Sequence, residues 1–235
     1  MAQARVLLIG LSGKLERELK GGLAARGHRP LVAPPGRPAL REAVRGAEAA
    51  VLSGPPELIA ELRTAAPRLS LLALCAGPDA ALAALRAGAE QTFPRTTAVA
   101  VLAALELSLR WRRPRPPREP GSHACGDLQV DLARRRVARG GRPLALTPAE
   151  FELLACLLAG AGRPVSRERI LERLGAAGGF DADTRLVDVH VRNLRKKVEL
   201  DPALPELVLS VPGIGYRLRP SSVERAVGAG CGSAA

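Results

Sequence analysis

The residues best suited to chemistry lie in one stretch, DTRLVDVHVRNLRKK at 183–197. Its apolar side chains recur at i, i+4, i+7 and i+11, and these are Val187, Val191, Leu194 and Val198. That spacing predicts a helix with one face against a core. The opposite face mixes positive charge, a carboxylate, an amide and a bare valine, namely Arg185, Asp188, Val189, Arg192, Asn193 and Lys196. Such a face is suited to a DNA major groove, with a helix that merely faces water as the alternative.

Four residues of that face match the chemistry of base edges. Arg192 can pair bidentately with guanine and Asn193 with adenine. Val189 suits a thymine methyl group, and Asp188 can accept from a cytosine amino group or orient Arg192. We therefore predict base readout by Asp188, Val189, Arg192 and Asn193.

A second group is suited to the DNA backbone, where contacts position a protein without specifying sequence. Ser166 and Arg167 qualify because they stand at the start of a predicted helix, where free N–H groups attract phosphate. The full predicted set is Ser166, Arg167, Thr184, Arg185, His190, Arg195, Lys196, Lys197, Gly213, Tyr216 and Arg217.

Composition allows this interpretation without proving it. The formal net charge is +12, which favours a polyanionic partner, but basic residues occur throughout the chain. The four cysteines form no CxxC pair and have no histidine at ligand spacing, so we expect no metal or other cofactor and a reducing, cytoplasmic location. No apolar run is long enough to cross a membrane.

The first half of the chain alternates short apolar runs with helical patterns. The predicted strands are Arg5–Ile9, Pro30–Ala33, Ala49–Leu52, Ser70–Cys75 and Gln91–Phe93. The predicted helices are Lys14–Ala25, Ala39–Arg45, Glu57–Ala65, Ala80–Ala87 and Val99–Arg110. This alternation predicts an α/β domain with a doubly wound parallel sheet.

The second half has a different texture, beyond a Pro- and Arg-rich stretch that predicts a semi-rigid linker. Short strands are expected at Asp127–Leu132, Arg136–Arg139 and Pro143–Leu146, followed by helices at 148–159 and Arg167–Leu174 and the two-faced helix. A hairpin of Leu207–Val211 and Tyr216–Leu218 closes the series. Small sheet, three helices and hairpin are the order of a winged helix-turn-helix α+β domain, whose third helix enters the major groove.

The run from Leu146 to Leu218 resembles the effector domain of OmpR/PhoB-type response regulators. LTPAEFELLACLL is similar to that family's first helix, SRERILERL to its second, RLVDVHVRNLRKKV to its recognition helix and SVPGIGYRL to its wing. Pro212 departs from the pattern, because an Arg usually precedes the first wing glycine; Arg217 and Arg219 are the candidate substitutes. The resemblance implies direct-repeat operators bound by a homodimer, and a loop, Gly175–Asp183, offered to RNA polymerase.

The same resemblance implies a flavodoxin-like, receiver-type fold for the first half, but the chemistry of a receiver is missing. Gly10 and Leu11 stand where two acidic residues hold Mg²⁺, and Ser53 stands at the phosphoacceptor aspartate. Cys75 and Arg95 replace the switch Thr/Ser and the Lys. A serine with neither metal nor base beside it is a poor phosphoacceptor. We expect a pseudo-receiver with no catalytic residues, no enzyme activity and no histidine kinase partner.

The resulting prediction is a cytoplasmic transcription regulator that binds double-stranded DNA. Its parts are a receiver-like domain at 1–112, a linker at 113–123, a winged-helix domain at 124–219 and a disordered tail at 220–235. Two alternatives stay open: a pseudo-receiver controlled by a small molecule or a protein partner, and an interaction scaffold that has lost DNA binding.

Overall fold

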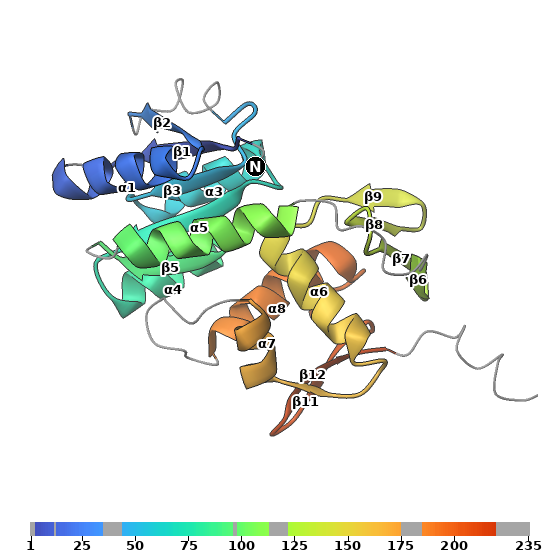
Figure 1. Ribbon diagram of the computed structural model, residues 1–235. Helices are drawn as coiled ribbons and strands as arrows, with labels where there is room; N and C mark the ends of the chain where they lie inside the picture. Colours follow the sequence, from blue (N-terminus) through green and yellow to red (C-terminus); the bar gives the residue numbers. More distant parts are fainter. Residues whose placement is uncertain are drawn as a thin grey trace, which may run out of the picture.

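A computed structural model describes residues 3–11, 13–34, 44–95, 98–112, 122–174 and 185–219 of the chain (Figure 1). Several predictions fall outside these residues: most of the 39–45 helix, the linker up to 121, the Gly175–Asp183 loop, Thr184 and the 220–235 tail. The side chain of Arg185 is also outside the description.

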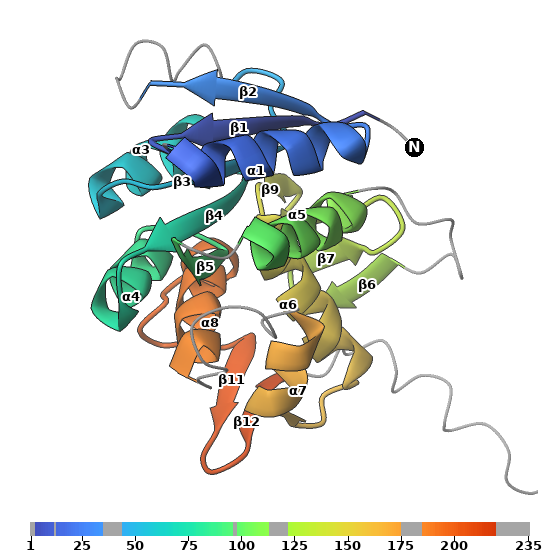
Figure 2. The same cartoon turned by 60° about the vertical axis from the view of Figure 1, so that its left-hand side comes forward.

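The first half folds into a five-stranded parallel sheet of order β2-β1-β3-β4-β5. Its elements are β1 (Arg5–Ile9), α1 (Gly13–Ala25), β2 (Arg29–Ala33), β3 (Ala49–Leu52), α3 (Pro56–Ala65), β4 (Ser70–Cys75), α4 (Pro78–Arg86), β5 (Gln91–Pro94) and α5 (Ala98–Arg112). Helices α1 and α5 pack on one face and α3 and α4 on the other (Figures 1 and 2). The predicted doubly wound α/β fold is confirmed.

The central strands β3 and β4 are apolar except for Ser70, because helices cover both faces of the sheet. Every residue of β3 and of β4 is buried. This continuous burial, rather than alternation, is why the strands could be recognised from uninterrupted apolar runs.

The second half is a winged helix with two small sheets. A four-stranded antiparallel sheet contains β6 (Ser122–Cys125), β7 (Leu128–Asp131), β8 (Arg136–Arg139) and β9 (Arg142–Leu144). Three helices follow, α6 (Pro148–Ala159), α7 (Arg167–Arg173) and α8 (Arg185–Val198). The second sheet has the order β10-β12-β11, from β10 (Val165–Ser166), β11 (Val208–Val211) and β12 (Gly215–Leu218).

Two strands were missed, the two-residue β10 and β6. Ser122 and His123 lie in β6 and pair with β7, although His123 was expected in the linker. The sequence SHAC contains no β-branched residue and no Phe, Tyr or Trp, and it follows a Pro-rich run, so its strand conformation depends on pairing with β7 rather than on its own propensity.

The two-faced helix is anchored as predicted. Its four-residue apolar stripe, from Val187 to Val198, belongs to the core of the winged helix, together with Leu153 and Leu157 of α6. Helix α6 begins with the expected capping box, because Thr147 Oγ1 accepts from the Glu150 N–H at 3.2 Å and the Glu150 carboxylate accepts from the Thr147 N–H at 2.8 Å.

Candidate nucleic-acid interface

The outer face of α8 is divided into two flanks by its surroundings. Asp188, Arg192 and Lys196 are exposed. Val189 is only 9% exposed and Asn193 is half-buried, although neither belongs to the stripe that faces the winged-helix core. The structure therefore leaves the Arg192 flank open and covers the Val189 flank.

The covering element is α4 of the parallel-sheet domain, which packs beside α8 (Figures 1 and 2). Asn193 Nδ2 donates to the Leu85 carbonyl at 3.3 Å, and Gln91 Nε2 donates to the Leu174 carbonyl at 3.1 Å. The expectation that Val189 is exposed was wrong, because a helix a hundred residues earlier in the chain lies against its face.

His190 is also buried, and removal from water lowers its pKa to about 4. The cause is desolvation, which disfavours the charged imidazolium. In this arrangement of the domains His190 is a neutral, enclosed side chain and is not displayed to a phosphate.

Asp188 connects three elements of the winged helix. Its Oδ1 accepts from Arg167 Nε at 3.0 Å and from the Tyr216 hydroxyl at 2.7 Å. The Arg167 guanidinium also lies 5.0 Å from the centre of the Tyr216 ring. Burial, followed by the hydrogen bond to Asp188, raises the pKa of Tyr216. Asp188 thus positions α7 and the wing relative to α8 instead of orienting Arg192.

Two further basic residues of α8 are engaged within the domain. Arg195 Nε and Nη2 donate to the Val208 carbonyl at 3.0 and 2.6 Å, which fastens β11 to the helix. Lys197 Nζ donates to the Ala145 carbonyl at 3.0 Å and to Glu150 Oε2 at 2.6 Å. Lys196 is the exposed cation between them.

The wing is the turn between β11 and β12. Gly213 there has a φ of +74°, and Arg217 on β12 is half-exposed. Ile214 at the tip is 51% exposed, a residue that the sequence analysis did not single out. An apolar residue at the tip could have been recognised from the turn sequence PGIG. The hairpin lies so close to β10 that Gly215 has no room for a side chain. A Cβ there would lie 2.2 Å from the Val165 carbonyl oxygen.

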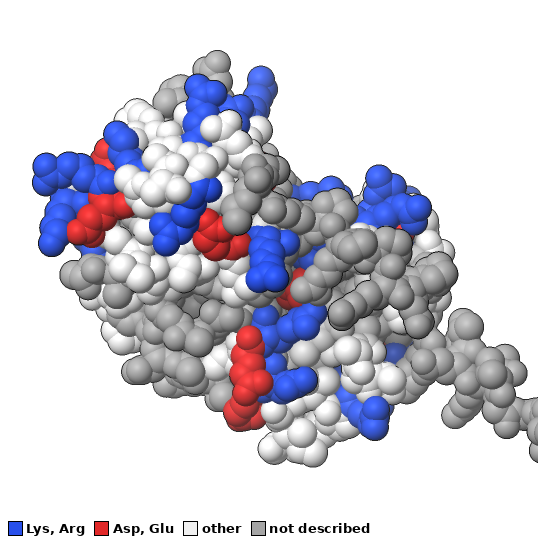
Figure 3. All heavy atoms as spheres, viewed as in Figure 1, with Lys and Arg blue, Asp and Glu red and all other residues white. Residues whose placement is uncertain are grey.

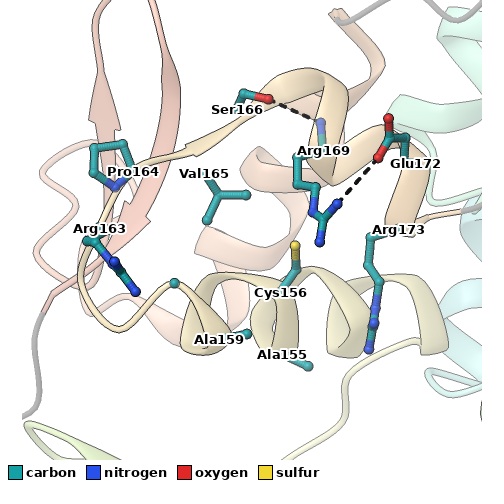
Figure 4. Close-up of a pocket in the computed structure, with 11 residues that line it drawn as sticks. Ala155, Cys156, Ala159, Arg163, Pro164, Val165, Ser166, Arg169, Glu172 and Arg173 are labelled. Atoms are coloured by element: carbon teal, nitrogen blue, oxygen red, sulfur yellow. Dashed lines mark hydrogen bonds and ion pairs between the residues drawn. The ribbon is translucent and has the colours of Figure 1, made fainter.

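Ser166 caps α7, since its hydroxyl accepts from the Arg169 N–H at 3.2 Å. It borders a groove of about 630 Å³ between α6 and α7, shown in Figure 4. Arg163, Arg169 and Arg173 surround this groove together with Glu172, and Arg169 pairs with Glu172 at 3.9 Å. Lys and Arg side chains also gather over α6 and α7 in the space-filling view, with acidic groups beside them (Figure 3).

The predicted phosphoacceptor positions do come together at the carboxyl ends of the parallel strands. Gly10 has a φ of +64°, and a Cβ there would lie 2.2 Å from the Ser53 carbonyl oxygen. Cys75 ends the neighbouring strand, where burial raises the pKa of its thiol and the charge of Arg95 partly opposes that rise. Leu11 packs against one of the two cores instead of facing this edge.

Within the part of the chain that the structure describes, no group of three His, Cys, Asp or Glu residues could hold a metal ion. None of the described helices is long and apolar enough to cross a membrane.

Some known proteins match only the C-terminal part of this chain, and others match most of its length. A family model described as "Transcriptional regulatory protein, C terminal" matches residues 141–218. The DNA-binding response regulator MtrA of Mycolicibacterium smegmatis is 42% identical over 97 residues, and the match spans only 42% of that protein. Response regulator MprA of Mycobacterium avium is 36% identical over 168 residues, covering 69% of this chain and 72% of MprA.

A solved structure of a RitR mutant matches over 93% of this chain and 100% of its own, with a TM-score of 0.65 at 21% identity. At that identity the match shows the shared fold, from the parallel-sheet domain through to the winged helix.

Proposed function

The chain belongs to the OmpR/PhoB-type response regulators, and from this premise we propose that it is a sequence-specific regulator of transcription that binds double-stranded DNA. The observation that carries the proposal is the exposed Arg192 flank of α8, presented by a winged helix whose core accounts for the opposite face. MtrA, similar over the same region, is named as DNA-binding.

In the proposed complex α8 enters the major groove. Arg192 reads a guanine, while Asn193 and Val189 read an adenine and a thymine methyl group. Asp188 does not read a cytosine. Its carboxylate instead holds Arg167 and Tyr216 next to the DNA backbone. Lys196, Arg217 and the backbone at Gly213 are the remaining phosphate contacts, with Thr184 and Arg185 as candidates that the structure does not describe.

Domain closure sets a condition on this binding. Helix α4 lies against the flank that contains Val189 and Asn193, so in the closed arrangement Val189 is buried and the Asn193 amide is bonded to the Leu85 carbonyl. Full base readout therefore requires α4 to leave α8. We propose that the closed arrangement is the low-affinity state and that separation of the domains produces the high-affinity state.

We also propose that aspartyl phosphorylation does not control this separation. Ser53 occupies the acceptor position, and Gly10 and Leu11 supply no carboxylate for Mg²⁺. No histidine kinase is then required, and a small molecule or a protein partner is the signal that fits. A loop at Gly175–Asp183 remains the proposed contact for RNA polymerase.

Direct-repeat operators and a homodimer are part of the proposal. Pairing through the last receiver helices would use α4 and α5, and Val99 at the start of α5 is 81% exposed. Since α4 packs on α8 in the closed arrangement, pairing through α4 and release of α8 would be coupled. We also propose a division into a receiver-like part that ends at 112 and a winged-helix part that ends at 219; the second part begins with β6, so the linker is shorter than predicted.

The test is selection of bound duplexes from a random pool with the full chain, across a salt series. A repeated motif and a salt slope of several phosphates are expected. Arg192→Ala should then weaken binding by about 1–3 kcal/mol and relax one base position. Arg142→Ala, an exposed arginine on β9, is the control and should change neither. Unselective or absent binding by the native chain would favour an interaction scaffold.

A further inference from the structure

A second cavity, of about 170 Å³, lies where the two domains meet. Arg68, from the connection between α3 and β4, forms one wall. Arg134 and Arg135, from the turn between β7 and β8, and Phe151 of α6 form others. Of the described residues that line the cavity, three carry a guanidinium and none carries a carboxylate.

Arg135 is held rigidly at this cavity. Its Nη1 donates to Glu152 Oε1 at 2.7 Å, and its guanidinium lies 4.2 Å from the centre of the Phe151 ring. Its backbone adopts a φ of +52°, an uncommon conformation for a residue with a side chain. The side chain is 14% exposed, so the surrounding protein fixes its orientation.

Arg134 is also ion-paired within its turn, but its side chain is 73% exposed. Its backbone N–H and its Nη1 donate to the two oxygens of Asp131, at 2.8 and 3.0 Å. Asp131 and Glu152 therefore orient the two guanidinium groups from outside the cavity. Arg135 is thus fixed before binding, and a donor fixed in advance loses little entropy when a ligand arrives.

We propose that this cavity binds a small oxyanion of at least two negative charges, a phosphate group either free or carried by a small metabolite. Guanidinium groups bind such oxygens through paired, charge-assisted hydrogen bonds. The volume lies below the 300–1,000 Å³ typical of sites for larger organic ligands, so the charged group itself is the part that binds between the arginines.

The two domains contribute different ligands to this site, Arg68 from one and Arg134 and Arg135 from the other. The anion therefore binds fully only when the domains are closed, and its binding free energy stabilises the arrangement in which α4 covers α8. Resting on the proposed function, this makes the anion a negative effector of DNA binding: DNA and anion weaken each other's binding by the same factor.

Binding is tested first without DNA, by calorimetric titration of the full chain with inorganic phosphate at constant ionic strength, with chloride as the reference salt. We expect one saturable site. Arg68→Gln should weaken it at least about tenfold, the equivalent of one lost charge-assisted hydrogen bond. Arg142→Gln, on the neighbouring β9 but outside the cavity, should leave it unchanged.

Three results would overturn the site: no saturable binding, equal binding by the native chain and Arg68→Gln, or loss of binding in Arg192→Ala, which would locate the anion on the DNA-binding face. Because no DNA is present, failure of the proposed function leaves this measurement intact.

Coupling is tested by measuring operator affinity with phosphate at ten times its own Kd. Operator binding by the native chain should weaken by up to about tenfold relative to matched chloride. In Arg68→Gln the two salts should act alike. An identical response of both proteins would exclude the coupling between anion and DNA, whatever the result of the titration.

Discussion

The carboxyl edge of the parallel sheet and the outer face of α8 are the two surfaces where this family's chemistry is expected, and they differ in what they retain. At the sheet edge the fold brings Gly10, Ser53 and Cys75 together, yet none of them is a carboxylate. On α8, Arg192 and Asn193 keep the side chains that base edges require. The architecture is intact in both, which shows that a fold is maintained by its core independently of the groups at its sites.

The two surfaces also differ in how they depend on the rest of the molecule. The sheet edge is completed within one domain, by strands that are neighbours in the sheet. The face of α8 is divided by α4, which covers one flank and leaves Arg192 open. The next four experiments test this contrast, beginning with the largest expected effect.

Leu194→Ala should lower the free energy of unfolding by about 2–5 kcal/mol, because it removes a fully buried side chain from the core that supports α8. Arg192→Ala, two residues earlier on the exposed flank, should change it by no more than about 0.5 kcal/mol. Urea denaturation measures both. Similar losses in the two variants would mean that the open flank is not exposed.

His190 predicts a pH dependence of stability. Its folded pKa is about 4 and its ordinary value is 6.5, so the unfolded chain binds the proton more strongly between these values. Stability should therefore be complete above pH 6.5 and fall by about 3 kcal/mol as the pH drops to 4. His190→Gln should flatten this part of the profile. A native profile that is level between pH 4 and 6.5 would contradict the burial of His190.

Gly10→Ala tests how closely the residue after β1 approaches the residue after β3 at the sheet edge. Both Gly10 and Gly13 have a φ near +60°, so each substitution with Ala should cost roughly 1–2 kcal/mol of backbone strain. Only at Gly10 would the new Cβ also meet a backbone oxygen, that of Ser53, while Gly13 has open space. The unfolding free energy should fall further in Gly10→Ala than in Gly13→Ala. Equal losses would show that the two strand ends are farther apart.

Ser53→Asp should have the smallest effect. It restores the acceptor carboxylate but not the acidic pair, since Gly10 and Leu11 remain. We expect no Mg²⁺-dependent incorporation of phosphate from acetyl phosphate, judged by intact mass, and unchanged operator affinity. Incorporation by this variant would show that the edge needs only the acceptor to regain its chemistry.

Local patterns explain why much of the fold was predictable. Thr147 and Glu150 form a capping box, a sequence pattern that predicted the start of α6. The apolar runs of β3 and β4 predicted strands that are buried on both faces. The core stripe of α8 was predictable for the same reason, because a 3.6-residue period needs only the neighbouring turns. The sequence did not predict β6, because the conformation of this strand depends on its pairing with β7.

The sequence indicated which side chains lie on the outer face of α8 but not how they are arranged. Asp188 was expected at a base edge or beside Arg192, and the structure places its carboxylate on Arg167 and Tyr216. Those contacts join residues 21 and 28 positions apart. No spacing rule within a helix could have indicated them.

The sequence by itself determined that α8 has an apolar inner face and a chemically varied outer face, because helical periodicity is a property of one segment. Only the tertiary structure decided that the outer face is half covered and that three arginines converge on a cavity between the domains. Both depend on residues far apart in the chain, such as Leu85 with Asn193 and Arg68 with Arg135. Packing between two distant elements produces no periodic pattern in the sequence of either element.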